Sequence, residues 1–318
     1  MLDPHGYSVI SALNSSGHSL GAMEIILKHP AGDLREGVDA PRRELLTARS
    51  RKWVLLSPAS AVVPDCFADI DTDAIRRDKL LAEMQRLRGS VYLEDGAITA
   101  KQLTDGRHRV DADESSWHLL VVDGDDRVCG CVRQQTYPVH AHFAQLNISG
   151  SALARSAEWG PKLKAAAESE LDLSRRLDLP CVEIGGWALA NSIRGTTEAV
   201  RMALAMYSLS QELGGAIGFS TVTRRHCSAS ILRRIGGRSF EYAGLPLPSY
   251  QDPQFKCEME LLRFYSWAPN PRYTAWIDEI RQELRTIPVL GGCRRSAFDS
   301  RANLRWSLLA KSDVAVSQ

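Results

Sequence analysis

Residues 181–197, CVEIGGWALANSIRGTT, contain a strand, a turn and the start of a helix in direct succession. The apolar run 181–190 follows Pro180 and predicts a buried strand that its two central glycines weaken. The polar turn 191–197 leads into a stretch with apolar side chains at helical spacing, which Gly214 and Gly215 end. A buried strand followed by a helix is a building unit of layered α/β domains.

The start of this predicted helix is a candidate anion-binding site. The first N–H groups of a helix have no partner within it, and the helix dipole favours negative charge there. Arg194 adds a cation, and Thr196 and Thr197 add hydroxyl donors. A phosphate-bearing ligand fits this chemistry. The alternative is a threonine-capped helix with a surface arginine.

Further strands and helices are predicted on both sides of this unit. Two β-rich runs joined by a Gly-Asp-Asp turn predict a hairpin before it, and alternating helices and strands follow it. The whole order is typical of an α/β layered domain. The predicted strands are 117–123, 127–133, 181–190, 216–223 and 257–265. The predicted helices are one that begins after 71–73 and has apolar residues at helical spacing from 75 to 87, and those at 151–178, 197–213, 226–235 and 273–284.

The chain is expected to divide into three parts. Residues 1–70 are rich in Gly, Ser, His and Pro, and only 22–28 and 52–56 resemble strands, so an irregular and dispensable extension is expected there. The main domain is expected over 71–267, because Asp71, Thr72 and Asp73 form a helix N-cap cluster. Residues 268–318 are expected to form a C-terminal helix and a polar tail.

Composition excludes several classes of partner. The chain has 39 Lys and Arg residues and 38 Asp and Glu residues, so its net charge is +1. This balance does not indicate binding to nucleic acid or to an anionic membrane. The seven cysteines show no CxxC, and no histidine has a partner at metal-ligand spacing, so no metal is expected. No run of about 18 apolar residues and no signal peptide is visible, so we expect a cytoplasmic protein without a membrane span.

The loop before the predicted helix resembles that of the GNAT superfamily. These acyltransferases carry Gln/Arg-x-x-Gly-x-Gly/Ala between a strand and a helix, and Arg194 and Ala199 fit this pattern whereas Thr197 replaces the central glycine. The resemblance implies a mixed central sheet flanked by helices, with acyl-CoA or a phosphopantetheine thioester as co-substrate and no prosthetic group. Its implied donor-binding residues are Leu189, Arg194, Gly195, Thr196, Thr197, Glu198 and Ala199.

Three short motifs are similar to those of a GNAT-related subgroup, the acyl-homoserine-lactone synthases and long-chain N-acyl amino acid synthases. They are residues 88–94 (RGSVYLE), 130–133 (GCVR) and 183–187 (EIGGW), and Gly186 stands where the subgroup has arginine. Ile98 stands where it has an aromatic residue. The resemblance implies that an acceptor is bound by Arg88, Tyr92, Asp113, Arg133 and Trp187.

Acyl transfer to an amine requires a base and stabilisation of an oxyanion. Glu183 is the candidate general base, directly or through water, with a structural pairing to Arg133 or Arg88 as the alternative. The resemblance places the oxyanion contact at the main-chain N–H of Leu189. Arg88 and Arg133 can bind a carboxylate or phosphate, or else pair with Glu94 or Asp113. Arg233 occupies the position of the tyrosine that protonates the thiolate in many GNAT enzymes.

The sequence therefore predicts an N-acyltransferase. Its donor would be acyl-CoA or acyl-carrier protein, and its acceptor the amine of a small molecule such as an amino acid. Two alternatives remain open. One is a catalytically degenerate GNAT-like module that binds an acyl carrier or a partner protein. The other is an acetyltransferase that uses CoA alone.

Overall fold

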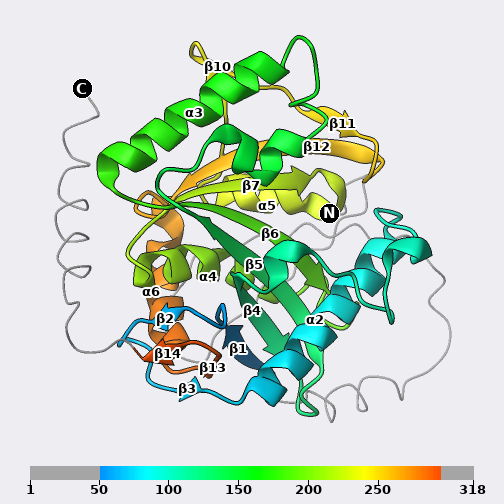
Figure 1. Cartoon of the computed structure of the whole chain (residues 1–318), viewed down its shortest axis with the longest axis vertical. Helices are drawn as coiled ribbons and strands as arrows, with labels where there is room; N and C mark the ends of the chain where they lie inside the picture. Colours follow the sequence, from blue (N-terminus) through cyan, green and yellow to red (C-terminus); the bar gives the residue numbers. More distant parts are fainter. Residues whose placement is uncertain (1–50, 295–318) are drawn as a thin grey trace, which may run out of the picture. The chain divides into compact units, whose positions relative to one another are not determined.

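A mixed sheet of ten strands runs through residues 51–294, the part of the chain that this computed structural model describes (Figure 1). Nine strands follow the order β11-β12-β7-β6-β5-β4-β1-β13-β3, and β8 pairs with β12. Two small two-stranded sheets, β10-β9 and β14-β2, accompany it. The strands are β1 (Lys52–Leu56), β2 (Val62–Val63), β3 (Ile70–Asp71), β4 (Ser116–Val122), β5 (Val128–Tyr137), β6 (Cys181–Leu189), β7 (Ile217–Thr223), β8 (Arg238–Ser239), β9 (Glu241–Tyr242), β10 (Leu245–Pro246), β11 (Tyr250–Asp252), β12 (Cys257–Tyr265), β13 (Val289–Leu290) and β14 (Cys293–Arg294).

Helices cover both faces of the large sheet. Apolar side chains of α2 pack on β1, β4 and β5, and those of α3 pack on β6, β7 and β12. Both helices lie on one face, because their contacts Cys131 and Tyr137 are an even number of residues apart on β5. Side chains of α4, α5 and α6 join the core on the opposite face. The α-helices are α2 (Ala74–Glu94), α3 (Gly160–Leu177), α4 (Glu198–Glu212), α5 (Ser228–Arg234) and α6 (Thr274–Leu284).

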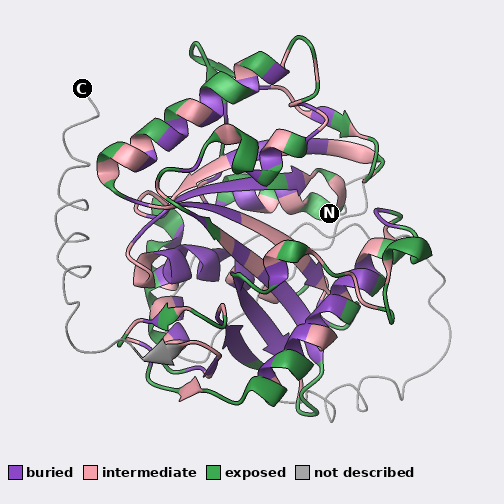
Figure 2. Cartoon of the chain, in the orientation of Figure 1, coloured by how far each residue is buried: buried purple, intermediate pink, exposed green. Residues whose placement is uncertain are grey.

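Short 3₁₀ turns occupy the connections: η1 (Ala100–Gln102), η2 (Asp111–Asp113), η3 (Phe143–Gln145), η4 (Asn147–Gly150), η5 (Arg225–Cys227) and η6 (Pro271–Tyr273). The predicted hairpin is β4–β5, which is buried along most of its length (Figure 2). The predicted N-cap is also confirmed, since the Asp73 side chain accepts hydrogen bonds from the N–H groups of Ile75 and Arg76. The helix predicted from residue 151 begins only at Gly160, after a series of turns.

The expected boundary at residue 70 is wrong for the described part of that segment. Strand β1 pairs with β4 over five residues and with β13 over two, and Leu55 and Leu56 are fully buried. Strand β13 comes from the other side of the expected domain, beyond residue 267. The local pattern did predict a strand at 52–56, which is β1, but its place in the main sheet depends on pairing with distant segments and could not be predicted locally. The expected strand 22–28 and the polar tail after Arg294 lie outside the described residues.

A substitution in β1 tests whether this strand belongs to the folded domain. Leu55→Ala should lower the free energy of unfolding by about 2–5 kcal/mol, because it removes buried methyl groups and leaves a cavity. Leu245→Ala is the matched control, since the Leu245 side chain is 71% exposed. Urea unfolding followed by circular dichroism measures both variants. Equal stabilities would contradict the place of β1 in the core.

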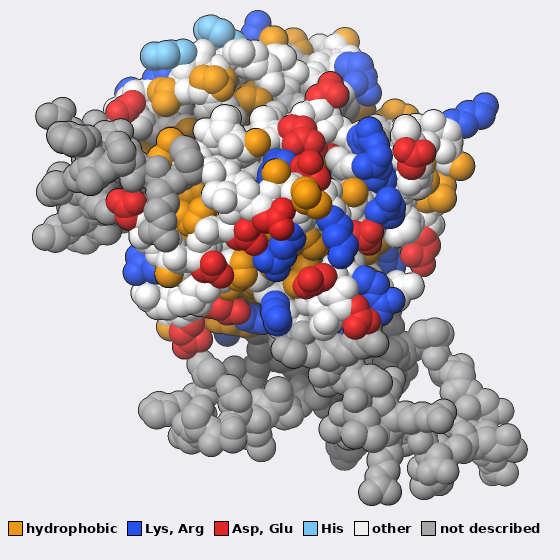
Figure 3. Space-filling model, turned by 60° about the horizontal axis from the view of Figure 1, so that its bottom comes forward, with side chains coloured by type: hydrophobic (Ala, Val, Ile, Leu, Met, Phe, Trp, Pro, Cys, Tyr) orange, Lys and Arg blue, Asp and Glu red, His pale blue; other side chains and the backbone are white. Residues whose placement is uncertain are grey.

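Charge is mixed over the surface. Basic and acidic side chains lie interspersed on the face in Figure 3, consistent with a net charge of +1. Within residues 51–294, no helix is both long and apolar enough to cross a membrane.

Candidate active site

Strand β6 lies in the middle of the sheet, yet its residues 184–187 are partly exposed. Its parallel ladder with β7 begins at Cys181–Ile217 and ends at Glu183–Phe219, although both strands continue beyond that pair. Thr221 of β7 is exposed as well. The two strands therefore stop pairing through their main chains after Glu183, although the Ser220 hydroxyl of β7 donates to the Ile184 carbonyl at 2.8 Å. We call this unpaired and partly exposed stretch of β6 the opening in the sheet.

A band of polar residues, Arg133, Gln135 and Glu183, crosses the face of the sheet that α2 and α3 cover, beside this opening. Arg133 pairs with Gly185, and Gln135 pairs with Glu183, between β5 and β6. Residues paired across two strands, and those two apart along one strand, point to the same face. The band separates the apolar cluster under α2 from the cluster under α3. The β5–β6 register thus brings together Arg133 and Glu183, which the sequence predicted as site residues.

Glu183 is buried and firmly held. Its Oε2 accepts hydrogen bonds from the Tyr137 hydroxyl and from the N–H of Asn147 at 3.0 Å, and its Oε1 accepts from the N–H of Ile148 at 2.9 Å. A carboxylate offers about four lone-pair sites, so roughly one remains, on Oε1. The expected structural alternative, a pair with Arg88 or Arg133, is absent among the described residues. Glu183 instead anchors the turn η4.

Arg88, Asp113 and Arg133 form a buried charged cluster. The Arg88 guanidinium donates to both oxygens of Asp113, with Nη1–Oδ1 at 2.8 Å and Nη2–Oδ2 at 2.6 Å. Arg133 Nη1 lies 3.6 Å from Asp113 Oδ1, too far for a hydrogen bond. Burial would raise the pKa of Asp113, but the hydrogen bonds and charge of Arg88 outweigh it and hold that pKa below its ordinary value. The ion-pair alternative is therefore correct for Arg88.

Neutral groups surround this cluster. Burial lowers the pKa of His118 to about 4, so its ring is neutral at pH 7, with Nε2 2.8 Å from the Asp113 carbonyl oxygen. Tyr92 packs edge-on against Phe255 at 6.1 Å between ring centroids, and burial raises its pKa. The ring centroid of His108 lies 5.6 Å from that of Tyr92.

Gly186 explains the missing arginine of the subgroup motif. Its φ of +63° belongs to the left-handed region that favours glycine. A Cβ atom there would lie 3.4 Å from the Cβ of Arg133 and 3.6 Å from Nη1 of Arg88. The β5–β6 register also shifts at this point, so β6 bulges opposite Val132. The two Cβ distances are ordinary van der Waals distances, so the left-handed backbone conformation, and not a lack of space, disfavours a longer side chain at this position.

The main chain of Leu189 faces the opening. The N–H of Ala190 donates to the Cys129 carbonyl at 2.8 Å, so these two residues form a hydrogen-bonded pair between β6 and β5. Hydrogen-bonded and non-hydrogen-bonded pairs alternate along an antiparallel ladder, so the main-chain N–H and C=O groups of the next pair, Leu189 and Gly130, point away from each other's strand. The Leu189 carbonyl accepts from Arg194 Nε at 3.0 Å on that side. The Leu189 N–H is therefore directed away from β5, toward the side of β7.

The predicted donor loop has an exposed tip over Gly195, Thr196 and Thr197. Gly195 has a φ of +74°, and the Thr196 hydroxyl donates to the Ile193 carbonyl while accepting from the N–H of Glu198 at 3.3 Å. Ala199 lies in the first turn of α4, where N–H groups lack helical partners. The Arg194 guanidinium is shared, because Glu94 Oε2 lies 3.8 Å from its Nη2.

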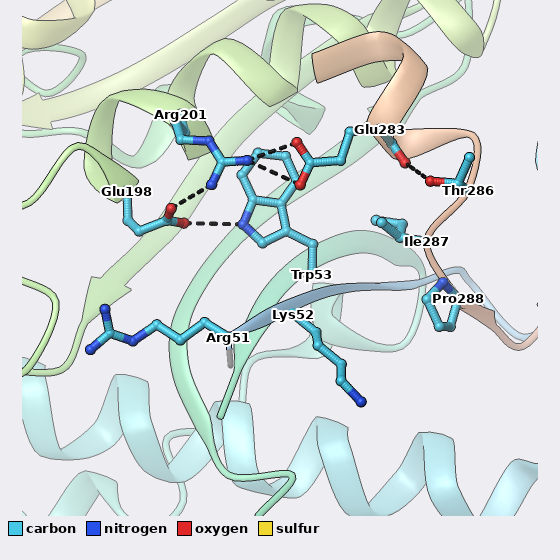
Figure 4. A pocket seen from close by; sticks show the side chains of 9 residues that line it. All are labelled: Arg51, Lys52, Trp53, Glu198, Arg201, Glu283, Thr286, Ile287 and Pro288. Atoms are coloured by element: carbon cyan, nitrogen blue, oxygen red, sulfur yellow. Dashed lines mark hydrogen bonds and ion pairs between the residues drawn. The ribbon is translucent and has the colours of Figure 1, made fainter. Parts of the chain in front are cut away.

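The Glu198 side chain points away from this tip. It lines a pocket of ≈ 270 Å³ with Trp53, Arg201 and Glu283 (Figure 4). Trp53 Nε1 donates to Glu198 Oε2 at 3.1 Å, and Arg201 Nη1 donates to Glu198 Oε1 at 2.6 Å. Arg201 also lies over the Trp53 ring and pairs with Glu283. The Glu198 side chain is therefore committed within this pocket, and its main-chain N–H is held by the Thr196 hydroxyl.

Trp187 is separated from the other predicted acceptor residues. Its ring packs against the apolar cluster on the α4 face, opposite Arg133. Sequence reasoning missed Tyr137 and the η4 amides that hold Glu183, because their partnership depends on the β5–β6 register. It also missed Gly185, where a Cβ would meet nothing within 4 Å, and the Glu94–Arg194 pair. The two neighbouring glycines in the sequence of β6 were the signal from which the open position at Gly185 could have been predicted.

Comparisons with solved structures show the fold. The CoA-dependent acyl-homoserine lactone synthase BjaI, solved with SAM and isopentyl-CoA, superposes with a TM-score of 0.50 at 16% identity, covering 80% of this chain and 100% of that chain. FeeM, an N-acyl amino acid synthase from uncultured soil microbes, gives 0.42 at 10% identity and covers 69% and 92%. No protein-family model and no curated protein matches the chain. The chain therefore has the mixed α/β fold of the acyl-homoserine lactone synthases, as its short motifs predicted.

Proposed function

We propose that the chain is an N-acyltransferase that moves an acyl group from acyl-CoA or an acyl-carrier protein to the amine of a small acceptor. The observation that carries this proposal is the opening at residues 184–187 of a central strand. A buried carboxylate, Glu183, lies at one end of it, and the N-terminus of α4 lies beyond the other. A thioester threaded between β6 and β7 would place its carbonyl group near the Leu189 N–H.

The chemistry follows from these positions. Glu183 takes a proton from the acceptor amine, directly or through a water, at its remaining lone-pair position. The amine nitrogen attacks the thioester carbon, and the Leu189 N–H stabilises the oxyanion that forms. Collapse of this intermediate forms the amide and breaks the C–S bond. Because a thiol has a pKa of about 8.5, the sulfur can leave as the thiolate without a protein acid.

Arg233 does not replace the missing tyrosine acid. Its Nε donates to Glu260 at 2.7 Å, and its Nη2 donates to the Ser239 hydroxyl at 2.8 Å. A guanidinium also stays protonated at every physiological pH. Departure of an unprotonated thiolate is therefore the simplest route for this chain.

Donor binding is tested at Arg194. Arg194→Ala should raise the KM for acyl-CoA about 10-fold or more, because a charged hydrogen-bond donor to phosphate is lost. Glu94→Gln is the matched variant: it leaves Arg194 in place and removes the competing carboxylate, so it should lower that KM. Thiol release measures turnover, and the shift in melting temperature with CoA measures binding. A KM for acyl-CoA that is unchanged or lowered in Arg194→Ala, or raised in Glu94→Gln, would contradict the assignment of this loop.

A product assay tests the function itself. The protein is incubated with acyl-CoA or acyl-carrier protein and a panel of amines, and mass spectrometry detects N-acyl products. Formation of an amide with one of the donors is the expected result. The second candidate, a module that binds an acyl carrier without catalysis, is favoured by the three donors that already hold Glu183. Donor-induced stabilisation without thiol release or amide would support that candidate.

A further inference from the structure

The loops that follow β6 and β7 flank the opening where the two strands stop pairing. The strands are parallel, so they end at the same edge of the sheet, β6 at Leu189 and β7 at Thr223. The predicted donor loop follows β6, and η5 with Arg225 and His226 follows β7. A ligand that enters between two parallel strands passes between such loops.

The C-terminal end of α2 bridges these two loops. On the β6 side, Glu94 Oε2 lies 3.8 Å from Arg194 Nη2. On the β7 side, Arg225 Nη1 donates to the Asp95 carbonyl at 2.6 Å, and His226 Nε2 lies 3.1 Å from the Asp95 carboxylate. Two neighbouring residues at one helix end therefore contact both sides of the opening.

A further contact strengthens the β7 side of this bridge. Arg225 Nη2 donates to the Phe255 carbonyl at 3.3 Å, in the turn between β11 and β12, and the Phe255 ring packs edge-on against Tyr92 of α2. One guanidinium thus joins the end of α2 to η5 and to the next turn. Its charge-assisted hydrogen bonds make this side stronger than the exposed ion pair of Glu94 and Arg194.

The charges at this helix end are unfavourable within α2 itself. The helix dipole places partial negative charge at the C-terminus, where cations stabilise a helix and carboxylates do not. The last turn of α2 contains no basic residue, Glu94 is its last residue and Asp95 is its C-cap. The two carboxylates therefore depend on the cationic groups of the neighbouring loops, and loss of these partners would destabilise this end of α2.

We propose that the C-terminal end of α2 is a clasp that holds the two loops together until the phosphates of an acyl donor displace Glu94 from Arg194. This inference rests on the proposed N-acyltransferase function and concerns access to the same opening. A phosphate on Arg194 neutralises the guanidinium and repels the adjacent Glu94 carboxylate, so α2 loses its contact with the donor loop. Donor binding and closure of the clasp then weaken each other by the same factor.

Hydrogen exchange of the amides of residues 93–98 tests the clasp on the unmodified protein. The N–H groups of Gly96 and Ala97 donate to main-chain carbonyls of α2, so they exchange only when this end opens. CoA at saturation should raise the exchange rate about 2–5-fold, the range for an exposed ion pair. Pantetheine has the thiol arm of CoA without its phosphates and should not raise that rate. Unchanged or slower exchange with CoA, or an equal rise with pantetheine, would overturn the proposal while leaving donor binding intact.

Variants open the clasp without a ligand. Arg225→Gln removes the charged donor to the end of α2, so exchange at 93–98 should rise about 10-fold or more in the free protein. Arg224→Gln is the control, because Arg224 pairs with Glu258 and not with α2. Glu94→Gln should abolish the rise that CoA causes and lower the Kd for CoA about 2–5-fold. Equal exchange in Arg225→Gln and its control would overturn the proposal.

A smaller anion separates this inference from the function on which it rests. If CoA changes neither the melting temperature nor the exchange of residues 190–197, donor binding has failed, and inorganic pyrophosphate is used as the probe. Faster exchange at 93–98 with pyrophosphate, absent in Glu94→Gln, would support the clasp although the transferase proposal had failed. No effect of pyrophosphate would overturn it. Circular dichroism confirms that each variant folds, and the comparison of CoA with pantetheine needs no variant.

Discussion

Glu183→Gln should reduce the turnover of the folded protein on the order of 10²–10⁴-fold, the usual cost of losing a general base. The glutamine has the same shape but cannot take a proton from the acceptor amine. Single-turnover thiol release, normalised to the folded fraction, measures the effect.

The surroundings of Glu183 also predict a loss of stability. The carboxylate accepts from one hydroxyl and two main-chain N–H groups, whereas the glutamine amide has a single acceptor oxygen. At least one buried N–H would then face an NH₂ group, which costs about 1–3 kcal/mol. The near-isosteric change is therefore not neutral here, and urea unfolding must accompany the kinetics.

Tyr137→Phe is the matched control for this variant. It removes one of the three donors to Glu183 and leaves the carboxylate able to take a proton. We expect comparable destabilisation with turnover that remains within about 10-fold of the wild type, since geometry and not base chemistry is disturbed. If Glu183→Gln kept full turnover per folded molecule, the carboxylate would serve only to anchor η4.

The fold could be predicted where local signals were strong. The strand–turn–helix at β6 and α4, the β4–β5 hairpin and the strands β7 and β12 carry apolar patterns and turn residues that identify them without tertiary information. Strand β1 was also predicted, over 52–56, but its place in the main sheet depends on pairing with β4 and β13. Strands β3 and β13 have two residues each and are defined by pairing alone. No local pattern marks a pair of residues such as Val289 and Leu290 as part of a sheet.

The candidate site, like the fold, has features that the sequence could predict and features that depend on tertiary structure. Motif resemblance found Arg88, Asp113, Arg133 and Glu183, and the structure brings these residues to one face of the sheet. Resemblance could not tell that Arg88 is already neutralised and Arg133 is not, because this difference depends on about one ångström in two contacts to Asp113. It also could not place Trp187 on the opposite face, since the bulge at Gly186 changes the alternation of side chains along β6.

Asp113→Asn should lower the free energy of unfolding by about 3–5 kcal/mol at pH 7, the cost of leaving a buried charge without its partner. The variant keeps the shape of the side chain but removes the negative charge that two arginines face. Asp105→Asn is the control, because its carboxylate is 74% exposed and its ion pairs with Arg107 and Arg109 are long. That control should change stability by less than about 1 kcal/mol.

The pH dependence of stability separates charge from shape in this variant. The folded pKa of Asp113 is depressed, so its contribution is fully present above the ordinary value of 3.8 and is lost as pH falls through the folded pKa. Wild type should lose this stability below about pH 4, and Asp113→Asn should not. The folded pKa of His118, about 4 against 6.5, gives a separate decline from pH 6.5 to 4 that both proteins should show. Urea unfolding at a series of pH values measures both slopes. Parallel curves below pH 3.8 would mean that Arg88 is neutralised by a group other than Asp113.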